Sequence, residues 1–186
     1  MRAAGIDAWS CDLKPCERGN EHHIQGDVLD AMMSRPWQFI GLHPDCTAMA
    51  VSGNRWYGSG APKCRERDEA VVRTVYMWTL AKQVAKFVYL ENPVSVIFRH
   101  LKNMGENVHY IQPWQHGHGE TKKTGLALHG LPPLMPSNVV DGREQRIWKM
   151  PPGPNRKADR SRTLSGVGAA IADQWGGILI QQATKQ

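Results

Sequence analysis

The sequence has little cysteine and no long apolar run. Its 186 residues contain four irregularly spaced cysteines, Cys11, Cys16, Cys46 and Cys64, whereas small secreted domains held by disulfides contain many. No apolar stretch approaches the roughly 20 residues that a membrane-spanning helix needs. The polar sequence after Met1 is also unlike a signal peptide. We therefore expect a soluble cytoplasmic protein with free thiols and no membrane partner.

Metal ligands are equally sparse. Cys11 and Cys16, with His22 and His23 nearby, have a spacing that fits no common zinc motif. Free thiols are the favoured interpretation, and a zinc site is the alternative. The glycine-rich loop 115–121 contains His116 and His118, which we expect at the surface or in contact with a substrate, with metal binding again the alternative. We predict no metal site.

The composition predicts one folded domain over residues 1–186. Hydrophobic residues make up 41% of the chain, which includes seven tryptophans, and such a chain can bury a core. The net charge is +6, and the excess is concentrated in a basic segment at 141–162. Prolines at 151, 152 and 154 predict a loop there and not a helix. Such a loop would suit a phosphate-bearing substrate, or it is an ordinary solvated surface.

Apolar periodicity predicts an α/β fold with a mostly parallel sheet. Buried strands are expected at 37–42 and 87–90, where short apolar runs occur. Asp27 is a plausible N-cap for a short helix. The clearest helix covers 65–86, with Val72, Val75, Tyr76, Thr79, Leu80 and Val84 as its apolar positions. Further strands are predicted at 6–13, 109–114 and 124–128, and a closing helix at 165–175.

Polar side chains follow several of these strands. Asp12 lies near the end of the first predicted strand, the turn His43–Thr47 follows the strand at 37–42, and Glu91 with Asn92 follows the strand at 87–90. In open α/β sheets, ligands bind at the carboxyl ends of the strands. A cysteine beside a carboxylate at that edge indicates a nucleophile with a proton-handling partner.

The order of these motifs resembles that of the DNA cytosine-5 methyltransferases, and most closely short phage-encoded relatives. Gly26-Asp27-Val28 is similar to the family's adenine-contacting Gly-Asp-Ile motif. The run from His43 to Gly53 resembles its Pro-Cys nucleophile loop, which also continues to a Ser-x-Gly. Glu91-Asn92-Pro93-Val94 resembles its Glu-Asn-Val motif. Residues 166–172 are similar to the last conserved helix, which helps to close the cofactor pocket. The resemblance covers most of the chain.

This resemblance implies a Rossmann-like methyltransferase fold and a covalent mechanism that uses S-adenosylmethionine. Cys46 would add to C6 of cytosine, Glu91 would bind and protonate N3, and Asn92 would orient the glutamate or the loop. It implies cofactor contacts for Asp12, Gly26, Asp27, His43 and Pro44. For the substrate, DNA or a cytosine nucleotide, we expect contacts from Asp45, Ser52, Arg143, Arg146, Arg160 and Arg162. Duplex DNA would require base flipping.

The sequence departs from the family pattern at two places. The pattern begins with a strand and a Phe-x-Gly-x-Gly loop that do not occur here, so we expect a sheet without its first strand. A homodimer or a partner chain could cover the edge thus exposed. Asp45 stands where the family has proline, and its charge is expected to raise the pKa of Cys46.

Two other functions fit the same residues. One is a catalytically degenerate Rossmann-like module that binds nucleic acid or nucleotides through segment 141–162. The other is a cysteine-dependent base-modifying enzyme without S-adenosylmethionine, in which Asp45 serves as an acid or base. If a phage encodes the protein, the host cytoplasm is its compartment.

Overall fold

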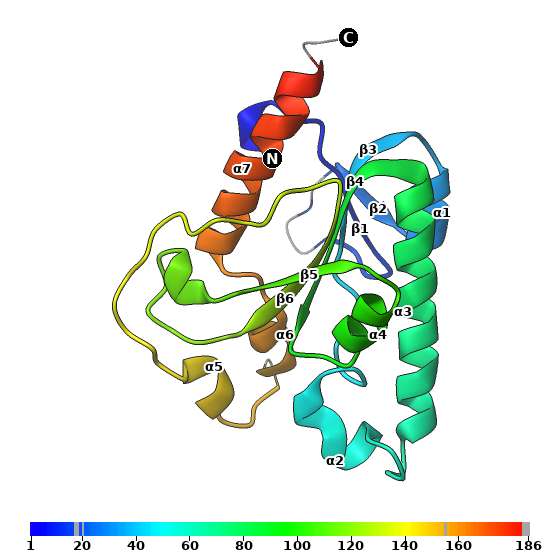
Figure 1. Ribbon diagram of the computed structural model, residues 1–186, viewed down its shortest axis with the longest axis vertical. Helices are drawn as coiled ribbons and strands as arrows, with labels where there is room; N and C mark the ends of the chain where they lie inside the picture. Colours follow the sequence, from blue (N-terminus) through cyan, green and yellow to red (C-terminus); the bar gives the residue numbers. More distant parts are fainter. Residues whose placement is uncertain (17–18, 20, 155, 184–186) are drawn as a thin grey trace.

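The computed structural model describes residues 1–16, 19, 21–154 and 156–183, which form a mixed α/β fold (Figure 1). Its strands are β1 (Ser10–Asp12), β2 (His23–Gln25), β3 (Trp37–Leu42), β4 (Ala85–Pro93), β5 (Asn107–Ile111) and β6 (Thr124–His129). Its α-helices are α1 (Val28–Met33), α2 (Asn54–Tyr57), α3 (Cys64–Val84), α4 (Ile97–Asn103), α5 (Arg146–Lys149), α6 (Arg156–Ser161) and α7 (Ser165–Ala183). The described residues also form the 3-10 helices η1 (Arg2–Ala4), η2 (Val51–Gly53) and η3 (Pro113–Gln115).

The strands form two separate sheets. β1 and β2 pair in parallel, and a second sheet has the order β3-β4-β6-β5. β3 and β4 are parallel, but β6 is antiparallel to both β4 and β5. The prediction of a mostly parallel sheet is therefore wrong for this half of the fold. β6 runs back between β4 and β5, so its start lies beside the carboxyl end of β4.

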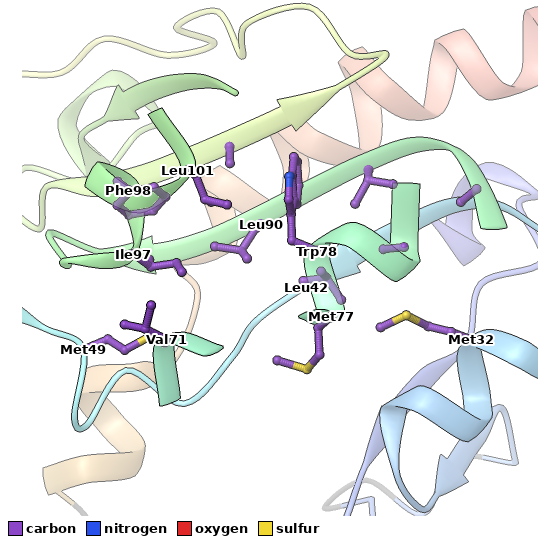
Figure 2. Packing of buried hydrophobic residues seen from close by; sticks show 14 residues of the cluster. Met32, Leu42, Met49, Val71, Met77, Trp78, Leu90, Ile97, Phe98 and Leu101 are labelled. Carbon is purple, nitrogen blue, oxygen red and sulfur yellow. The ribbon is translucent and has the colours of Figure 1, made fainter. Parts of the chain in front are cut away.

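Helices cover both faces of the larger sheet (Figure 1). On one face α3 and α4 enclose a cluster that includes Trp78, Leu90 and Phe98, and Met32 of α1 joins its edge (Figure 2). On the other face α7 packs against β4 and β6 through a second cluster, in which Trp175 is completely buried. The sheet is thus the middle of three layers.

The most buried stripe of the long helix lies next to the predicted one, of which Val75, Leu80 and Val84 are partly buried and pack against the core. Val72 and Tyr76 are 69% and 57% exposed, although they head the predicted apolar set. The buried positions of α3 are Val71, Thr74, Met77, Trp78 and Ala81. Apolar residues extend around much of this helix, so two neighbouring stripes have suitable spacing, and the large Trp78 side chain decides which one faces the sheet.

Several predicted boundaries also shift. The strand predicted at 6–13 is only Ser10–Asp12. β3 has its predicted bounds but lies at a sheet edge, and exposed Gln38 and Gly41 contradict burial on both faces. β5 ends at Ile111, short of the predicted residue 114, because Gln112 and Gln115 form a capping box that starts η3.

The carboxyl-terminal third is more helical than predicted. Segment 141–162, expected to be a loop, contains α5 and α6; residue 155 lies outside the described residues. The closing helix continues past Trp175 to Ala183. In contrast, the helix capped by Asp27 is confirmed, since the carboxylate accepts a hydrogen bond from Leu29 N. Within the described residues, no helix has the length and apolar character needed to span a membrane.

Candidate functional site

The carboxyl ends of β3 and β4 bring together the two motifs that the sequence analysis singled out. The strands pair in parallel with Leu42 opposite Leu90. The turn after β3 therefore lies beside Glu91 and Asn92, which are part of the end of β4. The predicted proximity of the cysteine turn and the Glu-Asn pair is confirmed at the level of the backbone.

His43 connects the two strand ends. Its Nδ1 lies 2.9 Å from Glu91 Oε2, and its Nε2 lies 2.8 Å from the Tyr89 hydroxyl. An ionised carboxylate only accepts hydrogen bonds, so a neutral His43 donates from Nδ1 and accepts the Tyr89 proton at Nε2. The His43 side chain is 44% exposed, whereas that of Glu91 is 11% exposed. His43 therefore links the enclosed glutamate to solvent.

Gly41 makes room for this hydrogen-bonded chain. It lies opposite Tyr89 in the β3–β4 register. A Cβ at Gly41 would be 2.5 Å from Tyr89 Cε1 and 2.7 Å from its hydroxyl oxygen. No heavier residue fits there unless the ring moves. Burial raises the pKa of Tyr89, and the Glu91 charge adds to this effect, so the phenol stays protonated.

Asn92 fixes the start of the cysteine turn. The residue is 1% exposed, and its Nδ2 donates to the Pro44 carbonyl at 3.0 Å. A buried amide held against the backbone of the neighbouring loop restricts where that loop can go. Pro44 is thus hydrogen-bonded to Asn92, and His43 to Glu91. The cofactor contacts expected of His43 and Pro44 stay a prediction.

Asp45 shapes the turn that presents Cys46. Its Oδ1 accepts hydrogen bonds from Thr47 N at 2.7 Å and from the Thr47 hydroxyl. The Cys46 carbonyl then accepts from Met49 N and Ala50 N, so the chain makes a helical turn directly after the cysteine. Ser52 lies on exposed η2, the next turn. The aspartate is thus a local cap, a role that proline could not fill.

The Cys46 thiol is shielded and lies in a mixed charge environment. Burial raises its pKa, and the carboxylate of Asp45 raises it further. Glu91 acts in the same direction, whereas the Lys122 ammonium lowers the pKa. The predicted effect of Asp45 is confirmed in direction, but desolvation is the larger cause. None of the four cysteines, all in the described part of the chain, forms a disulfide.

Lys122 is a site residue that the sequence analysis did not identify. Burial lowers its pKa, while Glu91, Cys46 and Glu120 raise it. Its Nζ donates to the Arg162 carbonyl at 3.0 Å. Lys122 and Glu91 line the same small cleft, together with Pro113, Thr124, Thr163 and Leu164. Only the return of β6 beside β4 brings this lysine to the site, and nothing in the local sequence predicts that pairing.

The predicted substrate-binding arginines have different surroundings. Arg143 stacks on Trp114, with its Cζ 3.9 Å from the ring centroid, and donates to the Val140 carbonyl. Arg146 Nη2 donates to Glu120 Oε1 at 2.9 Å. The charge of Arg160 lowers the pKa of Lys122, so Arg160 lies near the cleft. Arg162 contributes its carbonyl to Lys122.

The loop histidines have structural contacts. His116 is 2% exposed and its Nδ1 lies 3.0 Å from Ser137 Oγ. Burial lowers its pKa. His118 Nε2 accepts from Gly166 N at 3.0 Å, at the start of α7. The expected surface position is therefore wrong for His116. The described residues include no group of three or more candidate metal ligands.

The predicted cofactor carboxylates lie together at the ends of β1 and β2. Gly26 N donates to the Asp12 carbonyl at 3.0 Å. Burial is the main cause of the raised pKa of Cys11, and the charges of Asp12 and Asp27 raise it further. Asp27 accepts from Leu29 N and pairs with Arg73 at 3.0 Å. These two bonds lower its pKa. They leave about two of its roughly four acceptor positions for another donor.

Comparisons with known proteins are sparse. No model of a known protein family matches the sequence, and no curated protein matches it. Among solved structures, the fold is similar to that of a protein described as a candidate DNA modification methyltransferase encoded within a prophage (E. coli). The identity is 11% and the TM-score 0.42, over 70% of this chain and 42% of the other. A likeness at this TM-score carries no argument about function.

Proposed function

We propose that this chain is an S-adenosylmethionine-dependent, cytosine-C5 methyltransferase-like protein that acts on DNA or a cytosine nucleotide, with Cys46 as the nucleophile. The observation that carries the proposal is the position of the Cys46 turn beside the shielded Glu91 at adjoining strand ends. A thiol and a carboxyl group so placed can act on two atoms of one ring. The motif order described above supplies the identity of that ring.

The side chains divide the chemistry between them. The Cys46 thiolate adds to C6, and Glu91 gives a proton to N3, which takes up the charge that the addition creates. C5 then becomes nucleophilic enough to accept a methyl group. His43, which is hydrogen-bonded to Glu91 and reaches solvent, brings the proton that Glu91 first needs. Loss of the C5 proton to water and departure of the Cys46 thiolate restore the aromatic ring, and N3 returns its proton to Glu91.

Lys122 and Asp45 set the reactivity of the thiol in opposite directions. The ammonium stabilises the thiolate, whereas the carboxylate opposes its formation. Asn92 is a positioning residue in this mechanism, since it holds the Pro44 carbonyl and thereby the turn. The raised pKa of Cys46 makes it a weaker nucleophile in the free protein.

The residues at β1 and β2 fit part of a cofactor site. Asp12 and Asp27 would accept hydrogen bonds from the ribose hydroxyls and the adenine amino group of S-adenosylmethionine, and Asp27 retains acceptor capacity for this. When bound, S-adenosylmethionine supplies the electrophilic methyl group. Gly26, His43 and Pro44 are proposed as further contacts.

The division of the strands into two sheets supports a Rossmann-like methyltransferase sheet that lacks a strand between β1 and β3. β3 has no second hydrogen-bonded neighbour among the described residues. We propose that a second copy or a partner chain covers this edge, since an open edge strand is a ready template for pairing.

A catalytically degenerate nucleic-acid-binding module is the second candidate. The observation that favours it is the raised pKa of Cys46, to which Asp45 contributes, because a thiol is a weaker nucleophile than a thiolate. The third candidate, a base-modifying enzyme without S-adenosylmethionine, needs Asp45 as an acid or base. The hydrogen bonds from Thr47 to that carboxylate give Asp45 a structural role instead.

The experiment is methyl transfer from labelled S-adenosylmethionine to DNA and, separately, to a cytosine nucleotide. We expect the wild-type chain to label one of them and the Cys46→Ser and Glu91→Gln variants to fall to background. Cys64→Ser, which alters a free thiol at the start of α3, is the matched control and should retain activity. Full activity in Cys46→Ser would exclude the mechanism. A folded wild-type chain that binds DNA without methylating it would favour the binding module.

A further inference from the structure

Two tryptophans are exposed near the site. Trp56 on α2 is 53% exposed and Trp148 on α5 is 69% exposed. The other tryptophans in the described part of the chain are buried or of intermediate exposure. An exposed indole offers a large flat face on which another aromatic group can stack.

Both tryptophans lie at the end of the sheet that carries Cys46. In Figure 1, α2 and α5 are both at the lower end, where β3 and β4 finish. One contact from each helix agrees with this placement. Val51, just before α2, donates to the Val94 carbonyl directly after β4. On the other side, Arg146 of α5 is paired with Glu120, and the charge of Glu120 raises the pKa of Lys122 in the cleft.

Each tryptophan stands on an anchored element and beside basic groups. In α5, buried Ile147 and the Arg146–Glu120 pair fix the helix, so Trp148 extends outward with Lys149 next to it. In α2, the Arg55 guanidinium lies 5.4 Å from the Trp56 ring centroid. Lys63 N also donates to the Trp56 carbonyl. The backbone that carries each ring is thus held in place, which limits the positions that the ring can take.

This combination matches the chemistry of an unpaired polynucleotide. An aromatic face stacks on any base, and neighbouring cations accommodate the phosphates. Stacking requires a base whose own face is free, whereas bases within a duplex already stack on each other. A free nucleotide has a single base and cannot occupy two separate rings at once.

We propose that a polynucleotide with unpaired bases binds along this edge, with Trp56 and Trp148 stacking on bases to either side of the one presented to Cys46 and Glu91. The inference rests on the proposed function for the fate of the central base, but binding itself requires neither residue. It selects a polynucleotide over a free cytosine nucleotide and single-stranded or locally opened DNA over an intact duplex.

The test is fluorescence anisotropy with a labelled, cytosine-containing single-stranded oligonucleotide, its duplex and free cytidine monophosphate as competitor. We expect tighter binding to the single strand than to the duplex and no competition by the mononucleotide. Trp56→Ala and Trp148→Ala should each weaken binding about tenfold, while the phenylalanine variants retain most of the affinity. The dependence of affinity on salt should not change, because no charge is removed.

The matched control is Tyr76→Ala, which removes an aromatic side chain of similar exposure from the groove between α3 and α4 and should bind as the wild type does. Tighter binding to the duplex, alanine variants indistinguishable from the control, or no binding to any of the probes would overturn the inference. Cys46→Ser should bind the single strand normally. Normal binding without methyl transfer by the wild type would count against the proposed function alone.

Discussion

The hydrogen-bonded chain Tyr89–His43–Glu91 predicts a measurable coupling between its members. Tyr89 is 7% exposed, so His43→Ala leaves its hydroxyl without a partner, at a cost of about 1–3 kcal/mol. Loss of the bond to Glu91 adds about 1 kcal/mol. Tyr89→Phe removes the hydroxyl together with its need for a partner, and costs about 1 kcal/mol.

In the double variant the unpaired hydroxyl no longer exists. We therefore expect His43→Ala/Tyr89→Phe to be more stable than the sum of the single effects implies, by about 1–2 kcal/mol. Urea unfolding of the four proteins measures this, provided the slope of the transition is constant. The pair His43→Ala/Tyr76→Phe serves as control and should be additive. Additivity within about 0.5 kcal/mol for the first pair would refute the chain.

Two further predictions concern the same strand ends. The alkylation rate of Cys46, followed by peptide mass spectrometry across pH, should rise with pH through a pKa above the ordinary thiol value. Asp45→Asn removes a cause of the raised pKa and should move the curve to lower pH, whereas Lys122→Met should move it to higher pH; curves that coincide would contradict both assignments. Gly41→Ala should displace the Tyr89 ring and lower the free energy of unfolding by about 1–3 kcal/mol in urea unfolding, and an unchanged midpoint would show that the ring has room to move.

Local signals were sufficient to predict the elements that end in the site. The mainly apolar run of β3, the cap at Asp27 and the polar turn after Leu42 all depend on near neighbours in the sequence. The effect of Asp45 on the cysteine next to it is of the same kind. Each of these predictions needed only the chemistry of a few consecutive residues.

Long-range pairing could not be predicted in this way. The return of β6 between β4 and β5 carries Lys122 to the cleft, and it depends on which strands pair across the sheet. The partner of His43 was missed for the same reason, since Tyr89 is reached only across the β3–β4 register. His116 reads as a polar loop residue, but its burial depends on the contact with Ser137.

The most direct measurement of the central claim is covalent trapping on a 5-fluorocytosine oligonucleotide in the presence of S-adenosylmethionine. Fluorine at C5 cannot leave as a proton does, so a cysteine that has added to C6 stays attached after methylation. The account predicts a wild-type protein–DNA adduct that survives denaturation and maps to Cys46, and none with Cys46→Ser. An adduct at another residue, or methylation of ordinary cytosine by a chain that forms no adduct, would contradict it.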